Sequence, residues 1–111
     1  MSLIANTPKP PYFAVIFTSV RTEGDNGYSD MANKMVELAK QQPGFLGMES
    51  AREDIGITVS YWADLDSIKN WKMNTEHLDA QKAGRKFWYG AFKVRISKVE
   101  RDYDIDGKSN G

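Results

Sequence analysis

The chain has 111 residues and a mass of 12.6 kDa, which is enough for one domain. Lys+Arg and Asp+Glu both number 15, and this balance argues against nucleic-acid binding, which favours strongly basic surfaces. The absence of cysteine excludes disulfides, thiolate metal sites and cysteine nucleophiles. No apolar run approaches the roughly 20 residues that cross a membrane, and the N-terminus lacks the order of a signal peptide. We therefore expect a cytoplasmic protein without a membrane partner.

The first elements are a lead-in, a strand and a helix. Residues 1–11 hold three of the four prolines and predict an irregular lead-in. Tyr12–Arg21 is rich in β-branched and aromatic residues and predicts a strand. Both alternating sets of its side chains begin apolar, so this strand is expected to be buried on both faces. Apolar residues from Tyr28 onward follow the helical period, and the helix is expected to stop at Pro43-Gly44.

The second half of the chain predicts two strands, a helical region and a last strand. Their expected bounds are Phe45–Arg52, Ile57–Trp62, a helix opening at Leu65 and resuming over Thr75–Phe87, and a strand around Phe92–Ile96 that could reach Tyr103. Residues 53–56 have the length and the glycine of a hairpin connection. Asp64 or Asp66 is expected to cap the helix. Residues 104–111 are polar and predict a flexible tail.

The order β-α-β-β-α-β is that of the ferredoxin-like α+β fold, with a four-stranded antiparallel sheet and two helices on one face. Because the helices cover one face only, a first strand that is apolar on both faces leaves one apolar face bare. Large bare apolar patches are uncommon on monomers. No internal repeat supplies a cover, and a second copy of the sheet is the simplest candidate. We therefore expect a homodimer that forms through the sheet face.

The single histidine lies in the region that also holds all three tryptophans, residues 60–89. If residues 75–88 form one helix, His77 and Trp88 point within about 20° of each other, since a helix advances about 100° per residue. Gln81 falls on the same side, with Ala80 and Gly84. Two interpretations stay open at this point. His77 is either a hydrogen-bonded core histidine or the one titratable group of a pocket between the helices and the sheet.

The neighbouring residues allow the same two interpretations. Trp71, Trp88 and Tyr61 either form the core, as aromatic residues commonly do, or line that pocket. Arg85 either binds an anionic group there or pairs with an acidic neighbour on the surface. Other chemistries lack their motifs, because the sequence has no HExxH, GxGxxG or GxSxG pattern.

Together these residues resemble the antibiotic biosynthesis monooxygenase (ABM) domain over about Tyr12 to Tyr103. The matching positions are Pro43-Gly44-Phe45, Tyr61-Trp62, Ile68, Trp71-Lys72, Glu76-His77, Ala80-Gln81, Gly84-Arg85, Trp88-Tyr89 and Val94-Arg95. The resemblance implies a ferredoxin-like fold that dimerises sheet to sheet into an α+β barrel. It divides the chain into a lead-in at 1–11, an ABM-like domain at 12–103 and a tail at 104–111.

The family includes cofactor-free oxygenases that form quinones, haem-degrading enzymes, and members without a known activity. The haem-degrading branch places its ligating histidine where Gln81 stands here, and its first-strand asparagine has no counterpart in Tyr12–Arg21. The quinone-forming branch has a tyrosine near the position of His77. The resemblance thus favours an enzyme without a cofactor over a haem enzyme.

The leading hypothesis is a homodimeric, cofactor-independent monooxygenase that acts on a small aromatic or quinol. In it His77 is the base, Trp71 and Trp88 stack on the substrate ring, and Arg85 offsets negative charge. Gln81 and Tyr61 complete the lining. The first alternative is a non-enzymatic dimer that binds a small ligand or acts as a stress-related accessory protein. The second is a haem-binding or haem-degrading protein that uses His77.

Overall fold

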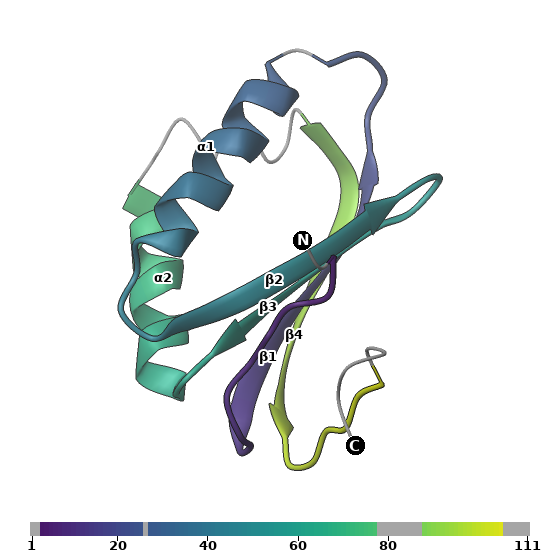
Figure 1. The fold of residues 1–111 in the computed structure, drawn as a ribbon. Helices are drawn as coiled ribbons and strands as arrows, with labels where there is room; N and C mark the ends of the chain where they lie inside the picture. Colours follow the sequence, from purple (N-terminus) through teal and green to yellow (C-terminus); the bar gives the residue numbers. More distant parts are fainter. Residues whose placement is uncertain (1–2, 26, 78–87, 106–111) are drawn as a thin grey trace.

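The computed structural model describes residues 3–25, 27–77 and 88–105. Its elements are β1 (Tyr12–Arg21), α1 (Tyr28–Lys40), β2 (Phe45–Arg52), β3 (Gly56–Trp62), α2 (Leu65–His77) and β4 (Tyr89–Val99). The strands form one antiparallel sheet in the order β2-β3-β1-β4, and both helices lie on the same side of it (Figure 1). The expected ferredoxin-like α+β fold is confirmed.

The central strand β1 is apolar on both faces, as the sequence predicts. Phe13 is paired with Trp62 of β3, and Trp62 stacks on Trp71 of α2 with ring centroids 6.0 Å apart. Phe13 therefore faces the helices, and Tyr12 faces the opposite side because neighbouring strand residues alternate. Trp62 is fully buried at 0% exposure, which makes it the centre of the packing between α2 and the sheet.

The beginning of α2 is fixed by a cap and by a close approach to the sheet. The Asp64 carboxylate accepts a hydrogen bond from the Ser67 backbone N–H at 2.7 Å, so Asp64 is the cap and Asp66 lies in the first turn. Gly44 has a φ of +83°, which favours glycine. A Cβ at Gly44 would lie 2.6 Å from the Ser67 Cβ. The glycine therefore allows the turn before β2 to pack directly against α2.

The described part of α2 is unbroken, whereas the sequence predicts that helical character stops and resumes at Thr75. The polar side chains of this stretch bond to the preceding turn rather than interrupt it. The Thr75 hydroxyl donates to the Lys72 carbonyl at 2.8 Å, and the Asn74 amide donates to the Asn70 carbonyl at 3.2 Å. These side-chain bonds to the helix's own carbonyls are compatible with a helix interior.

Strand β4 begins three residues earlier than expected and ends at Val99 rather than near Tyr103. The pairing with β1 shifts between Val20, which is opposite Ala91, and Arg21, which is opposite Tyr89. Gly90 is the extra residue of this bulge. Because a bulge inserts one residue, Tyr89 turns to the same side of the sheet as Phe92, and their rings lie 6.0 Å apart.

The lead-in covers part of the helix-free face of the sheet. The Ala5 N–H donates to the Glu49 carboxylate of β2 at 2.9 Å, and the Thr7 hydroxyl donates to the Tyr12 hydroxyl at 2.9 Å. Tyr12 and Ala14 are each only 4% exposed. The sequence predicts no cover for this face within the chain, but the lead-in covers one end of it.

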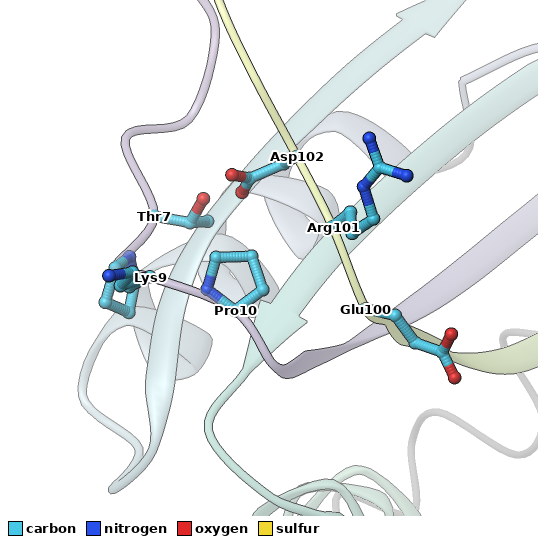
Figure 2. A pocket seen from close by; sticks show the side chains of 7 residues that line it. Thr7, Lys9, Pro10, Glu100, Arg101 and Asp102 are labelled. Carbon is cyan, nitrogen blue, oxygen red and sulfur yellow. The ribbon is translucent and has the colours of Figure 1, made fainter.

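A shallow hollow of about 430 Å³ lies where the lead-in passes the chain that follows β4. It is lined by Thr7, Pro8, Lys9, Pro10, Glu100, Arg101 and Asp102 (Figure 2). Its lining combines two prolines with polar side chains, and one of these, Asp102, accepts a hydrogen bond from the Tyr12 hydroxyl. Among the helices of the described residues, none is long and apolar enough to cross a membrane.

Candidate functional site

An apolar strip remains half-exposed on the helix side of β1 and β4. Val94 is the cross-strand partner of Phe17, and Ile96 is the partner of Val15. The two helices pack against β2 and β3 (Figure 1), and Phe92, Val94 and Ile96 keep exposed fractions of 45%, 47% and 54%. Apolar side chains on the inner side of a sheet are usually buried. This strip is therefore the part of the fold most suited to an apolar ligand.

Aromatic rings lie close together at the Phe92 end of this strip, where β1, β4 and the beginning of α1 meet. The ring of Phe17 lies 5.3 Å from that of Tyr89 and 5.5 Å from that of Phe92. Tyr28, the first residue of α1, lies 5.7 Å from Tyr89 and 6.1 Å from Trp88. The contacts are mostly edge-to-face, the arrangement that aromatic pairs prefer. We call Phe17, Tyr28, Trp88, Tyr89 and Phe92 the aromatic cluster.

Two arginines border the aromatic cluster. The Arg21 guanidinium lies 3.6 Å from the ring centre of Tyr28, donates from Nε to the Trp88 carbonyl at 2.9 Å, and donates to the Gly24 carbonyl at 3.1 Å. The Arg52 guanidinium donates to the hydroxyl of Ser19. Arg21 is therefore held by carbonyls and a ring, and Arg52 by a hydroxyl.

The phenol of Tyr89 stays protonated to high pH in this environment. Burial raises the pKa of Tyr89 most, and a hydrogen bond with Tyr28 raises it further. The positive charges of Arg52 and Arg21 act in the opposite direction and lower the pKa. Tyr89 is thus a neutral hydrogen-bonding group near two cations at neutral pH.

Of the residues that the sequence proposes for the site, Trp71 and Trp88 lie on the helix side of the sheet. Trp71 is half-buried and its ring stacks on Trp62 with an interplanar angle of 27°. Trp88 belongs to the aromatic cluster. The Trp62 indole also donates to the Ser60 hydroxyl at 2.9 Å, which fixes the ring on which Trp71 stacks.

Tyr61 lies on the other side of the sheet, away from Trp71. Its ring meets that of Tyr12 edge-on at 5.8 Å, and its hydroxyl donates to the Glu49 carboxylate at 2.6 Å. Burial and this hydrogen bond raise the pKa of Tyr61 above its ordinary value. Because Tyr61 precedes Trp62 in one strand, the pleat puts the two on opposite faces, and Tyr61 does not share a site with the tryptophans.

His77 is the last residue of α2. Its side chain lies outside what the structure describes, as do Gln81, Arg85 and the rest of residues 78–87. The single helix expected to run through to Trp88, and the shared side of His77 and Trp88, therefore stay predictions.

The aromatic cluster includes residues that sequence reasoning did not select, namely Phe17, Tyr28, Tyr89 and Phe92, and it adds Arg21 and Arg52 at its border. One signal was available, since a glycine within a strand pattern suggests a bulge, and Gly90 directly follows Tyr89. Within the described ranges, no group of three His, Asp or Glu side chains could hold a metal ion.

The arrangement combines a flat apolar surface with hydroxyl and guanidinium donors at one end. Such a surface can bind an aromatic ring by stacking and edge contacts, while the donors bind oxygen atoms on that ring. The donors carry protons or positive charge, so they favour oxygens that bear negative charge.

Three comparisons relate the chain to known proteins. The family model described as "Antibiotic biosynthesis monooxygenase" matches residues 11–83. The uncharacterized protein YqjZ of Bacillus subtilis (strain 168) is 52% identical over 103 residues, which cover 91% of this chain and 90% of that protein.

Two solved structures share the fold at low identity. A mutant form of SnoaB, a cofactor-independent oxygenase from Streptomyces nogalater, has a TM-score of 0.69 at 13% identity, covering 82% of this chain and 95% of that one. A putative antibiotic biosynthesis monooxygenase from Chloroflexus aurantiacus has a TM-score of 0.58 at 20% identity, covering 90% and 99%. With a family model that spans most of its length, the chain belongs to the antibiotic biosynthesis monooxygenase family.

Proposed function

We propose that the protein is a cofactor-independent monooxygenase that acts on a small aromatic or quinol-type substrate. The observation that carries the proposal is the half-exposed apolar strip on the helix side of β1 and β4, with the aromatic cluster at its end. Membership of the antibiotic biosynthesis monooxygenase family supports it. SnoaB, which shares the fold, is described as a cofactor-independent oxygenase.

The substrate itself supplies the electrons in this reaction. An anthrone-type CH2 group and O2 give a ring carbonyl and water, so one oxygen atom enters the substrate and the other leaves as water. Removal of a proton from the substrate forms the electron-rich anion that reacts with O2. The protein contributes a desolvated surface, hydrogen-bond donors for the developing charge, and a base.

We assign the base to His77, because it is the one imidazole in the chain and its unperturbed pKa lies near neutral pH. It ends the same helix that holds Trp71 against Trp62. Trp71 and Trp88 are assigned to the substrate ring. Arg85 and Gln81 are assigned to the substrate's oxygen atoms, and these two roles come from the sequence alone.

Oxygen uptake with a panel of hydroquinones and anthrones tests this function. Wild type is expected to consume O2 in proportion to product, and His77→Ala is expected to lose about 100-fold in rate, the usual contribution of a general base. His77→Gln distinguishes the loss of a base from the loss of packing volume. Equal rates in wild type and His77→Ala would refute the assignment of His77.

The same experiment decides between this function and its alternatives. Binding of these aromatics without any oxygen uptake would favour a non-enzymatic ligand-binding domain. A saturable Soret shift on titration with haem, abolished in His77→Ala, would favour haem binding instead.

We also propose that the protein is a homodimer that forms through the helix-free face of the sheet. The lead-in covers the Tyr12 end of this face, and the other end exposes Val20 by 46% and Ile57 by 42%. Both side chains lie beside Thr18 on this face, because Ile57 is the partner of Thr18 on β3 and Val20 follows Thr18 by two residues. A second copy packed against this end would bury the exposed apolar area by a self-complementary contact.

A further inference from the structure

The Arg52 guanidinium reaches across the helix side of the sheet toward the aromatic cluster. Arg52 is opposite Gly56 of β3, and Gly56 is opposite Ser19 of β1. The Arg52 guanidinium donates to the Ser19 hydroxyl and lies directly over Gly56, where a Cβ would overlap it. Since the bond spans from β2 to β1, the guanidinium crosses the width of β3 and lies over the end of that strand where Gly56 begins it.

The Ser19 hydroxyl, which accepts the hydrogen bond from Arg52, is buried away from water. Ser19 is 2% exposed, so the hydrogen bond with Arg52 replaces one that water cannot provide. A guanidinium has five N–H donors, and the bond to Ser19 uses one of them. Among the described residues, the ion pair that forms is Lys40 with Glu37, and neither Arg52 nor Arg21 has a carboxylate within ion-pair distance.

An aromatic surface begins one strand away from this cation. Ser19 is opposite Phe92 of β4, and neighbouring strands are about 4.8 Å apart. The ring of Phe92 contacts Phe17 and Tyr89. The positive charge of Arg52 also acts on the Tyr89 hydroxyl, so the guanidinium lies within electrostatic range of the aromatic cluster.

We propose that Arg52 is the specificity-determining residue of the site and that it selects aromatic ligands that carry a carboxylate. The ring of the ligand lies along Phe17 and Phe92, and its carboxylate pairs with the guanidinium. Arginine suits this role because its planar donors match both oxygens of a carboxylate. The inference rests on the proposed function, since it names the ligand class of the same apolar strip.

The test measures equilibrium binding of an unreactive pair, 2-naphthoate and 2-naphthamide, which share a ring and differ in charge. Isothermal titration calorimetry at pH 7 on wild type is expected to show at least a tenfold preference for the carboxylate. Arg52→Gln is expected to reduce the preference below threefold and to leave the affinity for the amide unchanged. Arg101→Gln is the matched control, because Arg101 is exposed in the segment after β4, at the opposite end of that strand from the aromatic cluster.

A second variant tests position separately from charge. Gly56→Ala keeps Arg52 but displaces its guanidinium from Ser19, so the preference is expected to fall as in Arg52→Gln. A wild type without preference, an Arg52→Gln variant that keeps it, or no binding of either ligand would overturn the inference. If the preference holds and no hydroquinone supports oxygen uptake, the monooxygenase proposal fails and the ligand class stands.

Discussion

Gly44→Ala is expected to destabilise the protein more than any ordinary surface substitution, because two separate costs fall on one position. Gly44 has a φ of +83°, which costs a residue with a Cβ about 1–2 kcal/mol. The new Cβ would also lie 2.6 Å from the Ser67 Cβ and closer still to its hydroxyl. Overpacking of this kind costs about 1–3 kcal/mol, so the expected total is about 2–5 kcal/mol.

Neither side of this contact can move easily. The Gly44 carbonyl accepts a hydrogen bond from the Ala63 N–H at 2.8 Å, and the Ser67 N–H is held by the Asp64 carboxylate. Relief of the overlap would therefore shift the beginning of α2, the helix that carries Trp71 and ends at His77. We expect Gly44→Ala to lower the oxygen uptake as well as the stability.

Gly27→Ala separates the two costs. Gly27 has a φ of +84°, and a Cβ there would meet no atom within 4 Å, so its expected cost is the backbone part alone, about 1–2 kcal/mol. Urea unfolding followed by tryptophan fluorescence gives both values. In a Ser67→Gly background, the cost of Gly44→Ala should fall to that of Gly27→Ala. Equal costs for Gly44→Ala and Gly27→Ala in the wild-type background would refute the overlap with Ser67.

Two further predictions concern the helix-free face. The raised pKa of Tyr61 means that its protonated form stabilises the fold, a contribution that is complete below the ordinary tyrosine value of about 10 and lost as the pH rises beyond it. Tyr61→Phe should cost about 1–3 kcal/mol of stability at pH 7, since a hydrogen bond to the charged Glu49 is lost, and the stability of this variant should fall less steeply above pH 10. Urea unfolding at pH 7 and above pH 10 measures both effects. The control Tyr103→Phe, at a residue 88% exposed, should leave the urea midpoint unchanged at either pH. For the proposed dimer, light scattering should give wild type twice the 12.6 kDa mass of one chain, and Ile57→Lys should have the mass of one chain. Ile96→Lys makes the same substitution on the helix side and should stay dimeric. A monomeric wild type would contradict the interface.

The order of the elements follows from local sequence signals. The bounds of β1 and β2 and the beginning of α1 agree with the sequence prediction, and α1 ends at Lys40, shortly before the expected stop at Pro43-Gly44. These signals act within a few residues. The cap at Asp64 is a contact over three residues and is equally local. The two apolar faces of β1 are also a property of its composition.

The candidate site depends on contacts that local signals do not encode. Tyr89 joins the aromatic cluster because the bulge at Gly90 reverses its side, and the aromatic residue that pairs with it, Tyr28, is 61 positions earlier in the sequence. Tyr61 could have been placed correctly, since the strand pleat alone puts it opposite Trp62.

The element order, the fold class and the apolar character of both sheet faces follow from periodicity and composition, because these act over short stretches of chain. What covers those faces depends on contacts between segments that are far apart in the chain. The lead-in has no periodicity, and it docks through an Ala5 hydrogen bond to Glu49 that joins residues 44 positions apart. The sequence likewise predicts only the end of a strand at Arg52. In the fold, Ser19 of another strand accepts a hydrogen bond from its guanidinium and holds it near the aromatic cluster. Such pairings arise from the register of neighbouring strands, which a linear pattern does not contain.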